Sequence, residues 1–221
     1  WVQKNHWYLQ FSLLFIALCN RILFVNSNAT ALAIFMISII AIAMAVGYFF
    51  GGKTWCNYIC PIGIVQKIYT EPGGVLESKA HLQKQTISQS MCRTSSENGD
   101  KSICVACTKN CPDIDLESSY WNGIENSARR FVYYGFFGLV SGFYGYYYLY
   151  SGNWDYYFSG IWTHETNQLQ QLFSPGFYFS GQSIAIPKIL AAPLTLALFV
   201  ITSYLLGSAA EKIYRLIRIK I

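Results

Sequence analysis

Two long stretches without a charged residue constrain the fold of this chain more than any other feature. Ala31 to Phe50 and Phe131 to Tyr150 each contain 20 residues and no Asp, Glu, Lys or Arg. A helix needs about 20 mostly apolar residues to cross the hydrocarbon core of a bilayer. Only 12% of the 221 residues are charged, against about 25% in an average soluble domain. The sequence therefore predicts a membrane protein and excludes a disordered chain or a free coiled coil.

Two further apolar runs complete the predicted set of spans. One is interrupted by Asn20 and Arg21, so a buried or interfacial helix remains an alternative there, and the other carries Pro193 in its first turns. The predicted fold class is an all-α membrane protein with four transmembrane helices, at residues 7–25, 31–50, 131–150 and 189–206. The predicted organisation is a transmembrane hairpin (1–50), a connecting segment (51–130), and a second transmembrane pair (131–221) with an outer aromatic loop at 151–183 and a basic tail.

The basic residues that flank these spans predict the orientation of the chain. Lys and Arg are enriched in cytoplasmic loops close to the membrane. Eight flanking basic residues lie on one side, and only Arg21 and Lys188 lie on the other. The eight are Lys4, Lys53, Arg129, Arg130, Lys212, Arg215, Arg218 and Lys220. We therefore expect a multi-pass protein of a bacterial inner membrane, or a thylakoid-type membrane, with both ends and the cysteine segment in the cytoplasm.

Six of the seven cysteines are concentrated between positions 56 and 111. Cys56 and Cys60-Pro61 form one element, Cys92 follows, and Cys104, Cys107 and Cys111-Pro112 form a second element. Bacterial ferredoxins bind their clusters through a C-x2-C-x2-C-x3-C-P run. The second element matches the last three cysteines of that run, with Lys101 at the first position. This spacing predicts iron–sulfur ligands, so residues 51–130 are expected to form a cytoplasmic iron–sulfur segment. Cys19 lies inside the first apolar run and is predicted to be a small apolar filler.

The number of cysteines limits how many clusters the chain can hold alone. We predict that Cys56, Cys60, Cys92, Cys104, Cys107 and Cys111 bind the iron of a [4Fe-4S] cofactor. Six thiolates suffice for one cluster, whereas a second cluster would need non-cysteine ligands or a partner. The sequence does not assign each cysteine to a cluster. A structural zinc site of four thiolates is an alternative, as are disulfides or unligated thiols.

The first cysteine element carries a family resemblance. Trp55-Cys56-Asn57-Tyr58-Ile59-Cys60-Pro61-Ile62-Gly63, placed just after an apolar run, resembles the C-x3-C-P-x-G element of membrane-bound polyferredoxin-like proteins. These include electron-transfer subunits that serve periplasmic nitrate and nitrous oxide reductases, and a cytochrome oxidase maturation protein. The resemblance covers roughly residues 31–112 and implies roles from quinol oxidation to electron supply or metal-centre assembly. Lys101 departs from the usual two-cluster pattern.

Two local structures are predicted around the cysteines. Pro61 is expected in the first turn of a helix that contains Ile64, Val65 and Ile68 and stops at Pro72-Gly73-Gly74. Residues 95–100, which include an Asn-Gly pair, are expected to form an exposed loop.

The predicted function is electron transfer between a cytoplasmic or quinone-pool donor and a partner protein. The chain is expected to contact membrane lipid, to meet a redox partner protein or quinone, and to be a subunit of a membrane complex that does not bind nucleic acid. No catalytic residues are predicted, and the chain is expected to be an electron-transfer component of an oxidoreductase complex rather than a stand-alone enzyme. A maturation or redox-sensing subunit and a zinc-stabilised scaffold are the alternatives.

Overall fold

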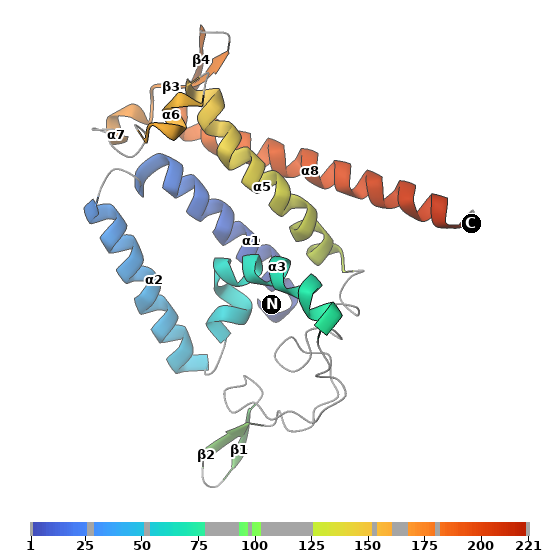
Figure 1. Ribbon diagram of the computed structural model, residues 1–221. Coiled ribbons are helices and arrows are strands. Elements are labelled where there is room, and N and C mark those ends of the chain that lie inside the picture. Colours follow the sequence, from blue (N-terminus) through green and yellow to red (C-terminus); the bar gives the residue numbers. More distant parts are fainter. Residues whose placement is uncertain are drawn as a thin grey trace. The chain divides into compact units, whose positions relative to one another are not determined.

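The computed structural model describes residues 2–25, 29–50, 54–77, 93–96, 99–102, 126–151, 154–160, 168–179 and 182–219, and Figure 1 shows the chain. It divides into two compact units. Unit 1 contains Trp1–Leu14 and Ile37–Arg130, and unit 2 contains Phe15–Met36 and Phe131–Ile221. The helices α1 and α2 therefore each contribute residues to both units.

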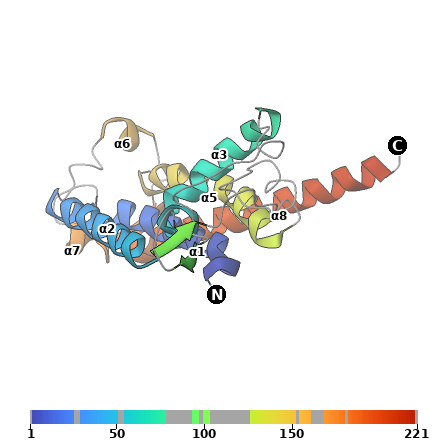
Figure 2. The same ribbon diagram turned by 90° about the horizontal axis from the view of Figure 1, so that it is seen from below.

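Helices dominate the described chain. The long helices are α1 (Val2–Asn20), α2 (Ala29–Phe50), α3 (Pro61–Glu77), α5 (Ser127–Ser151) and α8 (Lys188–Ile219). Short helical segments are the π-helices η1 (Arg21–Val25) and η2 (Trp55–Ile59), and the single turns α6 (Asp155–Phe158) and α7 (Gln168–Gln171). Each predicted apolar run lies within helical segments, so the helical character of these runs is confirmed. Figure 2 shows α8 extending toward the C-terminus, and this helix takes in most of the basic tail.

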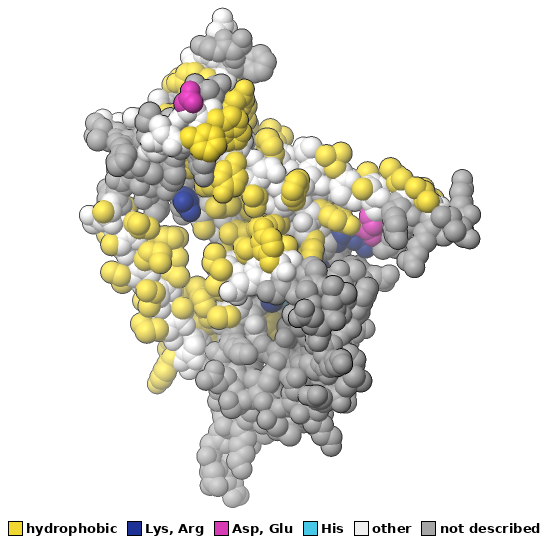
Figure 3. All heavy atoms as spheres, viewed as in Figure 1, with side chains coloured by type: hydrophobic (Ala, Val, Ile, Leu, Met, Phe, Trp, Pro, Cys, Tyr) yellow, Lys and Arg dark blue, Asp and Glu magenta, His cyan; other side chains and the backbone are white. Residues whose placement is uncertain are grey.

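Two of the helices are long and apolar enough to cross a membrane, by length and composition alone. They are α2 and the part of α8 from Lys188 to Ile213. A buried core helix or a signal sequence can have the same properties, so this finding favours a membrane protein only weakly. None of the residues in α2 is buried, and Figure 3 shows its hydrophobic side chains on the surface. A helix that is apolar all round needs an apolar environment.

Two small antiparallel hairpins correct the sequence-based expectation of loops. Strand β1 (Arg93–Ser96) pairs with β2 (Gly99–Ser102), with Ser96 opposite Gly99. Strand β3 (Pro175–Phe179) pairs with β4 (Gln182–Pro187), with an irregular register between Pro175 and Phe177. The loop predicted at residues 95–100 is wrong for the positions that lie in β1 and β2, whose residues include no apolar side chain and so lack the alternation that indicates a strand. Residues 97 and 98 lie outside the described residues. The region 151–183 likewise contains β3 and the start of β4.

Helix α3 begins as predicted but does not stop where expected. It starts at Pro61 and continues through Pro72, Gly73 and Gly74 to Glu77. An internal proline removes one backbone donor, and each glycine costs about 1 kcal/mol relative to alanine. These costs weaken a helix without having to end it, so the predicted stop was wrong.

Unit 2 is built on close contact between α5 and α8. A side chain at Gly138 would place its Cβ 2.3 Å from the carbonyl oxygen of Phe199, and one at Gly207 would lie 2.6 Å from the Tyr134 ring. A Cβ added at Gly142 would lie 2.9 Å from the Cβ of Phe199. Gly138 and Gly142 form a G-x-x-x-G pair, the spacing by which small residues let membrane helices approach closely. The buried centre of the unit also includes Leu139, Tyr146 and Leu196.

Candidate iron–sulfur site

The first two predicted ligands lie on a π-helical turn directly after α2. Cys56 is inside η2, and Cys60 follows its last residue. The backbone N–H of Cys60 donates a hydrogen bond to the carbonyl oxygen of Trp55 (2.7 Å), five residues earlier. Such π-type turns are rare and are frequently found at functional sites. The four-residue spacing of the cysteines is close to one turn, so both residues lie on a single short segment.

Pro61 explains why the turn ends at Cys60. A residue before proline is disfavoured in the helical region and shifts to an extended conformation. Cys60 has φ −58° and ψ 121°, as this rule predicts. Pro61 then begins α3, where its missing N–H costs nothing. The N–H of Gly63 donates to the carbonyl oxygen of Cys60 (3.1 Å). The Cys-Pro pair therefore separates the cysteine turn from the helix that supports it.

Gly63 completes the C-x3-C-P-x-G element for a steric reason. A Cβ at this position would lie 2.4 Å from the carbonyl oxygen of Cys56. Folded proteins essentially never contain a contact of this length, so only glycine allows the first turn of α3 to approach the cysteine turn this closely. The glycine of the motif thus permits the short distance between the cysteine turn and α3.

Gln10 of α1 reaches the same turn from a distant part of the sequence. Its Nε2 donates hydrogen bonds to the carbonyl oxygens of Cys56 (3.2 Å) and Cys60 (3.0 Å). The residue is fully buried. Sequence reasoning missed it, although a signal was available. Gln10 stands at helical spacing with the buried Trp7, Phe11 and Leu14, which marks it as a polar residue on an apolar face.

One basic side chain contacts the turn, and a second packs against the same tryptophan ring as the first. Nζ of Lys67 in α3 donates to the carbonyl oxygen of Asn57 (3.2 Å) and lies 5.1 Å from the centroid of the Trp7 ring. The guanidinium of Arg129 lies 5.5 Å from the same centroid and is only 4% exposed. The ring of His6 packs against Tyr58 of the turn. Positive charge near a cluster stabilises its reduced form, because net charge helps to set the reduction potential.

The two cysteines of the turn are suited to binding a metal cluster. Both are free of disulfides, and Cys56 is exposed while Cys60 is partly exposed. Cys19 is also free but buried, in agreement with its predicted role as a filler. Cys92, Cys104, Cys107 and Cys111 lie outside the described residues. Within the described ranges no group of three or more His, Cys, Asp or Glu side chains could hold a metal ion. The described turn thus contains two of the six cysteines that were predicted to bind the cluster.

Comparison with known proteins identifies the chemistry of this segment. Residues 32–78 match the family of 4Fe-4S binding domains. The matched region contains α2, the cysteine turn and α3, and it includes Cys56 and Cys60 but not the four later cysteines. No curated protein and no solved structure matches the chain. The predicted cofactor, a [4Fe-4S] cluster, is confirmed by this match.

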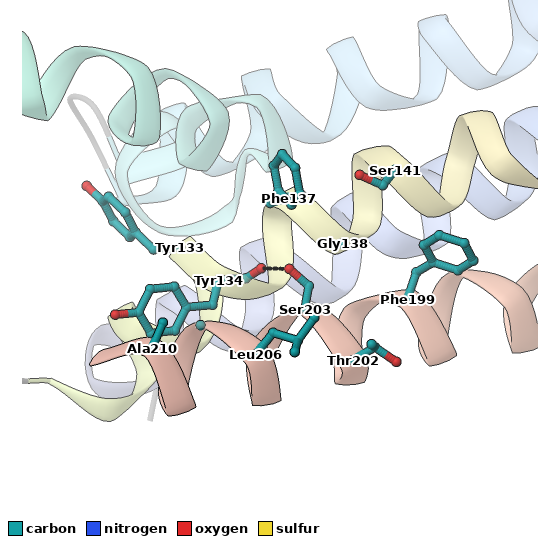
Figure 4. Close-up of a pocket in the computed structure, with 11 residues that line it drawn as sticks. Tyr133, Tyr134, Phe137, Gly138, Ser141, Phe199, Thr202, Ser203, Leu206 and Ala210 are labelled. Carbon is teal, nitrogen blue, oxygen red and sulfur yellow. Dashed lines mark hydrogen bonds between the residues drawn. The ribbon is translucent and has the colours of Figure 1, made fainter. Parts of the chain in front are cut away.

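Unit 2 contains a separate apolar cavity between α5 and α8. Its volume is about 580 Å³, and its walls include Phe137, Phe199 and Leu206 as well as the hydroxyl-bearing Ser141 and Thr202. Figure 4 shows these side chains and the hydrogen bond from Ser203 Oγ to the carbonyl oxygen of Tyr134, which is 2.7 Å long. A cavity of this size and composition is typical of sites that take a small, mostly apolar molecule.

Proposed function

We propose that this chain is a membrane-bound electron-transfer subunit of the polyferredoxin-like type. Its [4Fe-4S] cluster takes one electron from a reduced donor, either a cytoplasmic protein or a quinol, and passes it to an oxidised partner protein. The chain itself binds the cluster and holds it in place. A second cluster would require ligands beyond the six clustered cysteines.

The observation that carries this proposal is the junction of α2 with the cysteine turn. Helix α2 has 22 residues, and none of them is buried. Thr54 and the π-helix η2 follow within five residues of its end. If α2 crosses the bilayer, Cys56 and Cys60 lie at the membrane surface. This location would allow electron exchange with a membrane-dissolved carrier as well as with a protein.

Four spans and a cytoplasmic cysteine segment are part of the proposal. The lengths of α1, α5 and α8 support it, since they contain 19, 25 and 32 residues, enough for a helix to cross a bilayer of ordinary thickness. The asymmetric distribution of flanking Lys and Arg supports the orientation. The cavity between α5 and α8 is a place where an apolar carrier such as a quinone could bind.

Iron and sulfide analysis of the purified chain, followed by EPR of its reduced form, tests the redox role. We expect iron and acid-labile sulfide in equal amounts and a reduced-state signal that disappears on reoxidation. A cluster that neither quinol nor a reduced ferredoxin can reduce would favour the maturation or sensing role. Zinc without iron would reject the proposal.

Labelling of an introduced cysteine tests the orientation. Gln170 is exposed on α7, within the region predicted to face outward. Gln170→Cys should react with a membrane-impermeant maleimide in intact cells, and a cysteine introduced at the exposed Lys212 should react only after lysis. The reverse pattern would contradict a cytoplasmic cysteine segment.

A further inference from the structure

The amide of Gln10 is an unusual group to find in the core of unit 1. Burying a polar side chain costs free energy unless hydrogen bonds replace those it made with water. Gln10 is fully buried on α1 among Trp7, Phe11 and Leu14. An apolar side chain of similar size would satisfy the packing without this cost. The amide is therefore explained by what it contacts rather than by the core itself.

Both N–H groups of this amide can be used at the cysteine turn. A side-chain amide carries two donors on one nitrogen. Nε2 of Gln10 lies within hydrogen-bonding distance of the carbonyl oxygens of Cys56 and Cys60. These are the two cysteines of the C-x3-C-P-x-G element. The amide oxygen of Gln10, Oε1, is buried and has no hydrogen-bond partner among the described residues. One group from α1 thus joins the backbones of both cysteines.

The other hydrogen bonds to the turn do not duplicate the contact that Gln10 makes with Cys56. Lys67 donates a hydrogen bond to the carbonyl oxygen of Asn57, and the Gly63 N–H donates one to the carbonyl oxygen of Cys60. Both of these donors come from α3, which follows the turn directly. Gln10 alone, of the donors described, contacts the carbonyl oxygen of Cys56. It also lies 46 residues before Cys56, outside the segment that matches the 4Fe-4S binding domain.

We propose that Gln10 is a positioning residue of the iron–sulfur site, whose amide fixes the backbones of Cys56 and Cys60 relative to each other. Changing a group that holds a metal ligand in place typically lowers metal affinity about 10–100-fold. On this basis α1 is part of the cluster site. The inference rests on cluster binding by the turn and does not depend on the donor, the acceptor or the direction of electron flow.

Gln10→Met in the full chain tests the inference, because methionine has a similar length and cannot donate a hydrogen bond. The absorbance of the cluster is followed during challenge with an iron chelator. We expect the cluster of Gln10→Met to be lost roughly 10–100 times faster than that of the unaltered chain. The matched control is Gln170→Met, a change at an exposed glutamine of α7, and it should not alter the rate.

Two further readouts separate positioning from a general loss of stability. Clusters that remain in Gln10→Met should give an EPR spectrum with shifted g values, whereas a merely destabilised chain would give fewer clusters with the original spectrum. In metal-free protein, the alkylation rates of Cys56 and Cys60 should also change. Unchanged chelator resistance, spectrum and alkylation would overturn the proposal while leaving the electron-transfer role intact.

A folding defect is resolved with a second variant. Gln10→Glu keeps the side-chain length and a polar end group, but a carboxyl carries at most one O–H donor and so cannot donate to both carbonyl oxygens. If Gln10→Met does not accumulate in the membrane, Gln10→Glu should show the same fast cluster loss in a chain with unchanged helix content. Failure of both variants to fold would overturn the proposal, because it would assign the amide to the fold rather than to the cysteine turn.

Discussion

The cysteine turn and the α5–α8 pair use the same contact for different purposes. In each, a glycine faces a backbone carbonyl oxygen that a Cβ would almost touch, at 2.4 Å for Gly63 and 2.3 Å for Gly138. At the turn, side chains from α1 and α3 also donate hydrogen bonds to the carbonyl oxygens. The helix pair relies on close packing together with two hydrogen bonds between the helices, from Ser203 Oγ to the carbonyl oxygen of Tyr134 and from the Tyr134 hydroxyl to Glu211.

The difference shows how a short chain can provide both a rigid scaffold and a ligand site. Close packing between helices needs only small residues and complementary shapes. A ligand site also needs its backbone held at particular points, so polar groups are buried there despite their cost. Changes in unit 2 should therefore lower the folding stability and leave the cluster bound. Changes around the turn should release the cluster and have a smaller effect on folding stability.

The largest effect should follow removal of a thiol from the turn. Cys60→Ala should abolish the EPR signal of the [4Fe-4S] cluster if Cys60 is a ligand. Such a cluster is held by four thiolates, and loss of one leaves an iron atom without its protein ligand. Cys19→Ala is the matched control, since Cys19 is a buried free cysteine of α1. It should keep the iron and sulfide content of the unaltered chain. An unchanged EPR signal in Cys60→Ala would show that the turn does not bind the cluster.

Gly63→Ala should have the next largest effect. Its Cβ would displace either the first turn of α3 or the Cys56 carbonyl, and we expect cluster affinity to fall roughly 10–100-fold. Chelator challenge of the purified protein measures this fall. Gly47→Ala is the control, because nothing lies within 4 Å of a Cβ at that position in α2. Equal cluster retention in both variants would show that the close approach of Gly63 has no role in binding.

Gly138→Ala tests the other side of the comparison. Its Cβ would overlap the Phe199 carbonyl and the Ser203 side chain, so α5 and α8 must move apart. Overpacking of this kind costs about 1–3 kcal/mol of folding free energy. Thermal unfolding in detergent, followed by circular dichroism, measures the loss. The iron content of the folded protein should not change. A cluster lost in parallel with stability would mean that the two regions do not behave independently.

The sequence predicted the parts of this molecule that depend on local patterns. Charge-free runs predicted where the long helices lie, and the Cys-Pro pair predicted the start of α3 at Pro61. The preference of the residue before proline is a local rule, so it needs no knowledge of the fold. The pairing of β1 with β2 was missed because these strands contain no apolar side chain, so the alternation that indicates a strand is absent.

The contacts of the site could not be predicted in the same way. Gln10 reaches Cys60 across 50 residues, and a single polar residue in an apolar run does not indicate which segment it will contact. The role of Gly63 depends on how closely α3 approaches the turn, which only the packed structure reveals. Local composition therefore predicts the ligand types, and tertiary packing determines how their positions are fixed.

The smallest predicted effect concerns Lys67, which supports the turn without contacting a cysteine carbonyl. Lys67→Met removes a hydrogen bond to Asn57 and a cation–π contact with Trp7, each worth about 0.5–1 kcal/mol. It also removes a positive charge, so the reduction potential should fall. EPR-monitored redox titration measures the shift, with Lys212→Met on the exposed part of α8 as control. Lys67→Arg should restore the potential because the charge is kept. Equal reduction potentials in Lys67→Met and the unaltered chain would show that the charge of Lys67 does not affect the cluster. Lys67 would then have only a packing role.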